Sequence, residues 1–156
     1  MTGSSPAAFT TLVLALLAAS LATDASARGR VRARVHSRAE VEATIRRAEN
    51  ASDVFRKQMD DKLDKSALDG TKTEDNVNHQ AKELENALDR LRRRFDKTDT
   101  WRETRREVQD VLLEARDVNR IMEAGRWRAV LEAEWTRLRR ELNSLAGHYD
   151  LPPLGH

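Results

Sequence analysis

Histidines are the residues of this chain best suited to metal or haem chemistry, and two of them, His36 and His148, flank the predicted helical region. In an antiparallel bundle of four helices the start of the first helix and the end of the last lie together, so we expect these two residues to be neighbours. Imidazole nitrogens bind metal ions, and bundles of this class can hold a non-covalent haem or a metal ion. Both histidines flank their helices instead of projecting from a core face, which argues against such a site. His79 lies toward the opposite end, and His156 lies on the tail.

A second group that could hold a cation is the carboxylate run Asp60, Asp61 and Asp64, in which positions 60 and 64 share a helix face. Lysines stand beside these residues, and a solvated charge run is the interpretation we favour. The common catalytic motifs are missing: the sequence has no H-E-x-x-H, no G-x-S-x-G and no complete glycine-rich phosphate loop. The sequence therefore predicts neither an enzyme nor a cofactor.

The candidate binding residues are arginines that follow the predicted processing site, in "RGRVRARVHSR". In an extended chain the arginines at every second position from 28 to 34 would share one face. They would form an arm, residues 28–36, for an anionic surface such as lipid headgroups or a polyanion. A solvated, disordered leader is the simpler alternative, and the lack of interleaved aromatic residues favours it over specific nucleic-acid binding. The candidate residues are Arg28, Arg30, Arg32, Arg34 and Arg38.

Further arginines cluster at 92–94, 105–106 and 139–140, on the polar faces of the predicted helices. They could bind an acidic partner or an anionic envelope surface. The alternative, which we favour, is a soluble face balanced by nearby Glu and Asp.

The first 27 residues have the features of a secretory signal peptide. An apolar run of 14 residues, "FTTLVLALLAASLA", is followed by the small residues Ala25 and Ala27 in an A-x-A pattern. A membrane span needs roughly 20 apolar residues, so this run is too short to cross. Cleavage after Ala27 would remove only the charge of Asp24 and leave 28 basic and 25 acidic residues, a net charge of +3. The chain has no cysteine, which excludes disulfides and thiolate-bound metals.

The composition, with 35% charged and 4% aromatic residues, favours an all-α fold. Four apolar stripes of helical period predict an antiparallel up-down-up-down bundle over residues 37–147. The stripes are Val41, Ile45, Ala48, Phe55, Met59 and Leu63, with Ser52 in the missing step; Val77, Ala81, Leu84, Leu88, Leu91 and Phe95; Trp101, Val108, Leu112, Ala115, Val118 and Met122; and Trp127, Val130, Leu131, Trp135, Leu138, Leu142 and Leu145.

Local signals predict where these helices begin and end. Capping boxes, in which a Ser or Thr is followed three residues later by Glu, start at Ser37, Thr71 and Thr100. The first helix should stop near Leu68, because Asp69-Gly70 is a turn signal. A phase slip of the stripe at Gly125 indicates a turn or a sharp kink between the third and fourth helices.

The last helix should end at Gly147, in the left-handed conformation that glycine favours, before the prolines at 152 and 153. Tyr149, Leu151 and Leu154 in the tail, residues 148–156, can then fold back over the end of the bundle. The tail would thus be a lid on the core.

Residues 80–154 resemble a group of uncharacterised exported bacterial proteins. The likeness rests on "ELENALDRLRRRFDKTDTWRETRREVQDVL" and "WTRLRRELNSLAGHYDLPPL", which contain a Trp-x-x-Leu-Arg-x-Glu-Leu-Asn-x-Leu-Ala element, a Tyr soon after it and a Leu-Pro end. The resemblance implies a helical envelope or secreted protein with no assigned activity. Small periplasmic chaperones are also exported, cysteine-free and helical, but their Leu-Thr-x-x-Gln motif is absent here.

Together these features predict a non-enzymatic, exported helical binding or structural protein of the bacterial envelope, periplasmic or secreted. Its partner would be an envelope protein or an anionic surface, and it would not be an integral membrane protein once the signal is cleaved. A periplasmic holdase and a haem- or metal-binding bundle are the alternatives. The stripes suit packing within one chain or between two, so a homodimer also stays open.

Overall fold

The computed structural model describes residues 36–65, 71–124 and 128–155. The predicted signal peptide, residues 28–35 of the predicted arm, the Asp69-Gly70 turn signal, Gly125, Trp127 and His156 lie outside the described residues, and the side chain of Val130 is likewise not described. The elements are α1 (Arg38–Leu63), α2 (Lys72–Phe95), the short 3-10 helix η1 (Trp101–Thr104), α3 (Arg105–Ala124) and α4 (Arg128–His148).

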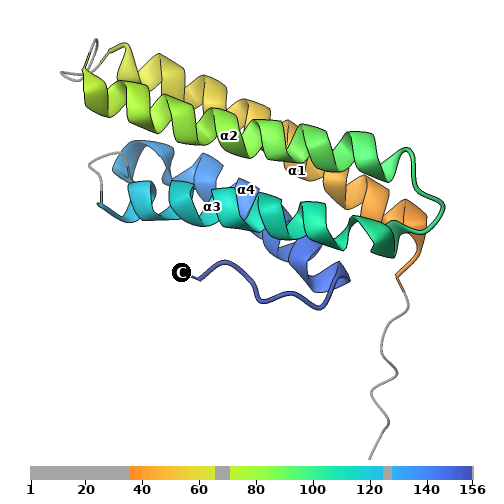
Figure 1. Ribbon diagram of the computed structural model, residues 1–156. Coiled ribbons are helices and arrows are strands. Elements are labelled where there is room, and N and C mark those ends of the chain that lie inside the picture. Colours follow the sequence, from red (N-terminus) through yellow and green to blue (C-terminus); the bar gives the residue numbers. More distant parts are fainter. Residues whose placement is uncertain (1–35, 66–70, 125–127, 156) are drawn as a thin grey trace, which may run out of the picture. The chain divides into compact units, whose positions relative to one another are not determined.

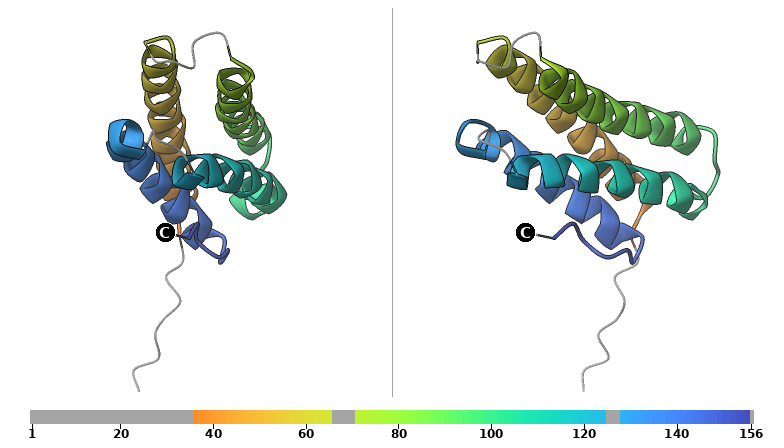
Figure 2. Two further views of the ribbon diagram at one scale, coloured as in Figure 1. Left: turned by 90° about the vertical axis from the view of Figure 1, so that its left-hand side faces the viewer. Right: turned by 60° about the vertical axis from the view of Figure 1, so that its left-hand side comes forward.

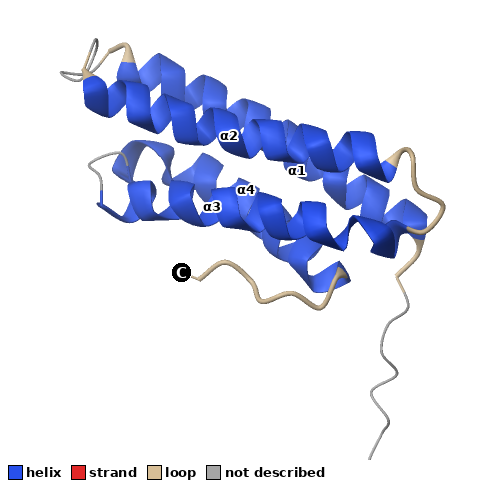
Figure 3. Cartoon of the chain, viewed as in Figure 1, coloured by secondary structure: helices blue, strands red, loops and turns tan. Residues whose placement is uncertain are grey.

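The four α-helices run alternately in opposite directions, and no strand occurs in the described part of the chain (Figure 3). Helices that follow one another in the sequence pack together, and α4 also packs against α1, which closes the bundle. α1 and α2 form one layer and α3 and α4 the other (Figures 1 and 2). The predicted all-α, up-down-up-down bundle is therefore confirmed.

α1 and α2 begin where the capping signals predicted, whereas the signal at Thr100 starts the 3-10 helix η1, and α3 follows it from Arg105. Ser37 caps α1 in a complete box: its Oγ accepts the Glu40 N–H at 3.2 Å, and its own N–H donates to the Glu40 carboxylate at 2.8 Å. Thr71 Oγ1 accepts from the N–H of Glu74 at 3.4 Å at the start of α2. These contacts satisfy N–H groups that have no partner inside a helix, and they fix the register of each first turn.

The end of α1 was predicted wrongly. The helix ends at Leu63, five residues before the expected Leu68, and Asp64 caps it by donating its N–H to Asp60 O at 3.0 Å. Leu63 is the last buried side chain of the α1 stripe, while Asp64 and Lys65 are exposed. The helix therefore ends with the last residue of its predicted stripe.

The core is made of the predicted stripes. Every stripe residue whose side chain is described is buried, including Ser52. The stripes alone missed several residues beside them, namely Thr44, Ala51, Ala87, Val111 and Ala146, which are buried as well. Each helix of a closed bundle faces two neighbours, so its buried face is wider than a single stripe.

The third and fourth helices are separate elements, as the phase slip predicted. α3 ends at Ala124, and α4 begins at Arg128 and runs back along it (Figure 1). Gly125, to which the break was assigned, lies outside the described residues.

The predicted end of α4 at Gly147 is also wrong. The helix continues through Gly147 to His148, and the left-handed residue is Asp150, with φ of 52°. Leu151 N–H donates to Ala146 O at 3.0 Å and Asp150 N–H to Gly147 O at 3.5 Å, which is the hydrogen-bond pattern of a Schellman motif. The prediction failed because the docked Tyr149 and Leu151 side chains, and not the glycine, decide where the chain turns.

This correction predicts two stabilising substitutions. A Cβ at Gly147 would meet nothing within 4 Å, so Gly147→Ala should raise the free energy of unfolding by about 0.5–1 kcal/mol through helix propensity. Asp150→Gly should add a similar amount, about 0.5–1 kcal/mol, by relieving the left-handed backbone. Urea unfolding measures both effects. A loss of stability in Gly147→Ala would show that the helix ends at the glycine after all.

Candidate functional site

The candidate site is the end of the bundle at which the described part of the chain begins. We call it the arm end; it comprises residues 36–47, 92–105 and 139–151. The start of α1, the turn between α2 and η1, and the end of α4 meet there (Figure 1).

His36 and His148 are neighbours at the arm end, as predicted. Their ring centroids are 4.3 Å apart, and the rings meet edge to face at 81°. His148 Nε2 lies 2.9 Å from the Thr44 hydroxyl, which donates to Glu40 O at 2.9 Å and accepts from Arg47 Nη2 at 2.9 Å. The hydroxyl has one hydrogen, so the tautomer of His148 decides which of the two atoms donates in their contact.

This arrangement bears on chemistry in two ways. The Thr44 side chain is only 1% exposed and its oxygen makes three hydrogen bonds, so a nucleophilic role for it with His148 as base has no geometric support. No group of three or more His, Asp or Glu able to hold a metal ion occurs among the described residues, where Asp60, Asp61 and Asp64 also lie. His79 is exposed on α2.

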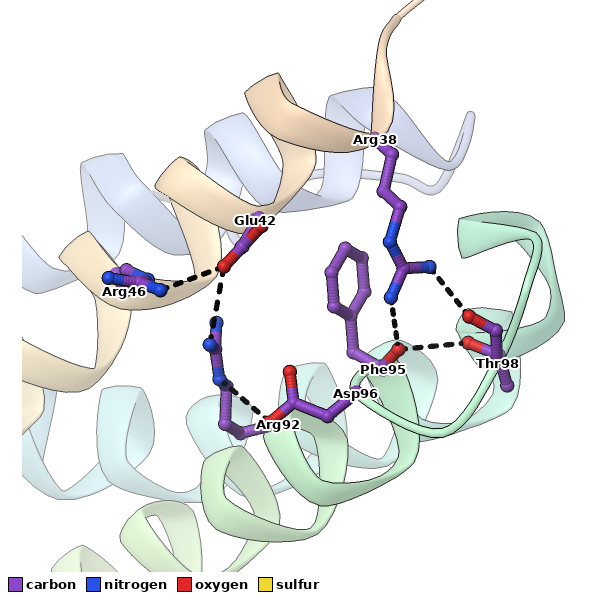
Figure 4. Close-up of polar contacts among 7 residues, drawn as sticks. All are labelled: Arg38, Glu42, Arg46, Arg92, Phe95, Asp96 and Thr98. Carbon is purple, nitrogen blue, oxygen red and sulfur yellow. Dashed lines mark hydrogen bonds and ion pairs between the residues drawn. The ribbon is translucent and has the colours of Figure 1, made fainter.

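Arg38 is the predicted arm residue that the structure describes, and it belongs to the bundle. It is the first residue of α1, and its guanidinium donates to Thr98 O at 2.8 Å and to Phe95 O at 2.7 Å (Figure 4). Its Cζ atom also lies 4.2 Å from the centre of the Phe95 ring. The cation thus satisfies carbonyls at the end of α2, where the helix dipole favours positive charge. Arg38, which the sequence offered as one candidate residue for binding an anionic surface, is therefore a clamp between α1 and α2.

A second polar contact joins the same helices one turn away. Glu42 Oε1 accepts from Arg46 at 2.8 Å and from Arg92 at 3.3 Å, and Arg92 Nε lies 3.3 Å from Asp96 Oδ2 (Figure 4). The hydrogen bonds from Arg46 and then Arg92 lower the pKa of Glu42. Burial, by contrast, raises the pKa of Glu49, which lies two turns beyond Glu42 along α1.

The two glutamates should respond to pH in opposite ways. Because the folded pKa of Glu42 is lowered, its ionised form stabilises the fold above its ordinary pKa, and this contribution is lost as the pH falls through the folded value. Glu42→Gln should therefore lower the Tm at neutral pH and have little effect near about pH 3. The raised pKa of Glu49 means that its charge opposes folding at neutral pH.

Glu49→Gln should accordingly raise the Tm at neutral pH, and the gain should disappear below about pH 4, where wild-type Glu49 is protonated. Thermal unfolding of both variants from about pH 3 to pH 7 measures these differences. If the change in Tm followed the same pH dependence in both variants, the opposite pKa shifts of Glu42 and Glu49 would be contradicted.

The other predicted arginine clusters are partly occupied within the chain. Arg94 lies 3.8 Å from the Glu107 carboxylate, and Arg140 lies 3.5 Å from that of Glu141. Arg105 donates to the carbonyl of Tyr149, and Arg139 donates to that of Gly155 at 3.5 Å. These arginines balance acidic groups or hold the tail, in line with the interpretation that the sequence favoured.

The tail folds back on the bundle as predicted. Tyr149 and Leu154 are buried, Leu151 packs against the core, and the chain turns back along α4 (Figures 1 and 2). The sequence did not reveal the residue that holds it: Asn143 Oδ1 accepts the Leu154 N–H at 2.7 Å, and Asn143 Nδ2 donates to Leu154 O at 3.5 Å. The signal in the sequence that could have identified Asn143 is its place: it is an uncharged polar residue directly after Leu142 of the α4 stripe.

Two general findings complete the description. None of the described helices combines the length and the apolar character needed to cross a membrane. Comparisons of the chain with protein-family models, with curated proteins and with solved structures found no match.

Proposed function

We propose that this chain is a non-enzymatic, exported binding or structural protein of the bacterial cell envelope, in which an arginine arm captures an anionic surface and the bundle is its scaffold. The distribution of charge along the sequence carries this proposal. Residues 28–35 contain four arginines and no acidic residue, a net charge of +4, whereas residues 36–156 contain 24 basic and 25 acidic residues, a net charge of −1. The whole positive charge of the processed chain thus comes from the arm.

The residues that join the arm to the bundle, His36, Ser37 and Arg38, support the same function. The His36 ring contacts that of His148, Ser37 caps α1, and Arg38 donates hydrogen bonds to two carbonyls at the end of α2. Three consecutive residues are therefore fixed to three different parts of the arm end. The bundle thus begins directly after the arm, with contacts from these residues to α1, α2 and α4.

The arginines of the bundle support the arm as the capturing element. Arg38, Arg92 and Arg105 are all engaged in contacts within the chain. An arginine that must give up such contacts gains less from an anionic surface than one that does not.

Vesicle binding tests the proposal. Each arginine near an anionic lipid surface contributes about 1 kcal/mol, so four contribute about 4 kcal/mol. Replacing Arg28, Arg30, Arg32 and Arg34 by serine in the processed chain should therefore weaken binding to phosphatidylserine-containing vesicles by up to roughly a thousandfold. The remaining binding should depend only weakly on salt. Cosedimentation at several salt concentrations measures both quantities.

A matched control removes the same charge from the bundle. Arg90, Arg106, Arg116 and Arg137 are exposed, and replacing them by serine also removes four positive charges. This control should retain most of the wild-type affinity. Equal losses in the two variants would show that only net charge matters, and unchanged binding in both would refute the arm.

The two alternatives have weaker support. A holdase needs an exposed apolar surface, and the large apolar side chains that are exposed in the described part of the chain are Val54 and Leu113, on α1 and α3. A haem or metal carrier could use the neighbouring His36 and His148, but among the described residues no third possible ligand lies with them, and His148 Nε2 already contacts Thr44. We therefore propose neither.

A further inference from the structure

His36 and His148, which we call the histidine pair, form a contact whose charge depends on pH. Their rings meet edge to face with centroids 4.3 Å apart, and both residues are partly buried. The contact joins the residue before the N-cap of α1 to the last residue of α4. Imidazole is the side chain that changes its charge between about pH 5 and 8, so two of them this close together form an acid-sensitive contact.

The two positions differ in how well they accommodate a positive charge. His148 ends α4, where the helix dipole favours a cation, and a protonated His148 can donate from Nε2 to the Thr44 hydroxyl, 2.9 Å away. His36 directly precedes Ser37, the N-cap of α1, and the dipole disfavours a cation at that end. A first proton on His148 is therefore compatible with the contact. A second proton, on His36, adds a like charge to the neighbouring ring, and the two charges repel.

The charged groups around the histidine pair do not offset this repulsion. The arm end contains 11 basic and 7 acidic residues, a net charge of +4 before either histidine is protonated. Arg47 bonds the same Thr44 hydroxyl at 2.9 Å and pairs with Glu141 at 2.8 Å, and Glu40 accepts from the N–H of Ser37. The charged residues of the elements that meet at the pair include Arg38, Glu40 and Arg47 of α1, Arg105 of α3, Glu141 of α4, and Asp150 after it. These six carry three positive and three negative charges, so two further protons add uncompensated positive charge.

We infer that the histidine pair is a pH-sensitive contact, closed near neutral pH and opened below about pH 6 when both rings are protonated. Opening frees residue 36, the last residue of the arm, from α4. It also adds a positive charge at residue 36 and another at its former partner. An anionic surface should consequently be bound more tightly in acid. This consequence rests on the proposed function, whereas the opening of the contact does not.

The ring signals of the histidines test the opening directly. The full chain has four histidines, at positions 36, 79, 148 and 156, and single His→Gln substitutions assign their NMR signals. The nuclear Overhauser effect between the rings of His36 and His148 should be present at about pH 7.5 and lost at about pH 5. The indole N–H of Trp135, which donates to Asn119, should keep its chemical shift, which excludes general unfolding. A ring contact that persists at the lower pH would overturn the inference.

A double-mutant cycle adds a readout that a purely structural contact would not move. The free energy of unfolding is measured for the wild type, His36→Gln, His148→Gln and the double variant at both pH values. The coupling between the two positions should stabilise the fold near about pH 7.5 and vanish or change sign near about pH 5. His79→Gln, at an exposed position of α2, is the matched control and should have the same effect at both pH values. A coupling that does not change with pH would contradict the opening.

Vesicle binding distinguishes the regulation from the proposed function. Each positive charge near an anionic lipid surface contributes about fivefold in affinity, so the wild type should bind phosphatidylserine-containing vesicles up to roughly thirtyfold more tightly in acid. The variant with both His36→Gln and His148→Gln should lose most of this gain and still bind through the arm at neutral pH. An equal gain in both proteins would refute the regulation, while no binding by either would refute the arm. The ring contact is measured without vesicles, so neither result decides whether it opens.

Discussion

Trp135→Ala should lower the free energy of unfolding by about 3–5 kcal/mol, which is the usual cost of deleting a large aromatic side chain from a core. Trp135 is 1% exposed and links three helices. From α4 its ring packs against Phe55 of α1 with centroids 5.4 Å apart, and its Nε1 donates to Asn119 Oδ1 of α3 at 3.1 Å. Small domains are stable by only about 5–15 kcal/mol, so this variant should lose a large part of the free energy of unfolding.

Urea unfolding followed by far-ultraviolet circular dichroism measures this effect. Leu113→Ala is the matched control, because Leu113 is 54% exposed on α3 and its loss should change stability by no more than about 0.5 kcal/mol. Trp135→Phe keeps most of the ring and should cost about 1–2 kcal/mol, mainly from the lost hydrogen bond. Equal costs for Trp135→Ala and Leu113→Ala would mean that α4 does not pack as described.

Tyr149→Ala should cost about 3–4 kcal/mol, because Tyr149 is a buried aromatic residue that joins the tail to η1. Its ring meets Trp101 edge to face, with centroids 5.0 Å apart, and its hydroxyl lies between Thr104 Oγ1 and Trp101 O. Burial raises the pKa of this phenol, which keeps the hydroxyl protonated as a donor. The loss of the side chain should therefore weaken the η1 packing and release the tail together.

Tyr149→Phe separates the two contributions. It keeps the ring contact and removes only the hydroxyl, so it should cost about 1–2 kcal/mol. In both variants proteolysis should remove the residues after Asp150 faster than in the wild type, and faster in Tyr149→Ala. If Tyr149→Ala unfolds like the wild type, the tail is not anchored through this residue.

The sequence was sufficient to predict the features that repeat along the chain. A stripe such as that from Val77 to Phe95 recurs every three or four residues, and this periodicity identifies both the helix and its buried face. The capping boxes at Ser37 and Thr71 are local in the same sense, since each cap contacts a residue three positions away. The bundle topology follows from four such helices joined by short connections.

The features that the sequence did not reveal depend on residues far apart in the chain. Arg38 looked like one more arginine of a basic arm, but its partners are 57 and 60 residues away. Asp150 turns the chain because Tyr149 before it and Leu151 after it pack on the core. Aspartate tolerates a left-handed backbone, but the glycine at 147 was the stronger local signal. Contacts between residues so far apart in the sequence can be identified only from the positions of the helices in space.

The central claim is that the arm, and not the bundle, makes the contact in the envelope, and crosslinking inside cells tests it most directly. A photoreactive residue is placed at Arg32 in one strain and, as the matched control, at the exposed Leu113 of α3 in another. Both strains express the full chain, residues 1–156, and the adducts are identified by mass spectrometry. We predict that the probe at Arg32 captures envelope lipid or one or two envelope proteins, while the probe at Leu113 captures little. A dominant partner at Leu113 with none at Arg32, or adducts to cytoplasmic proteins alone, would contradict the proposal.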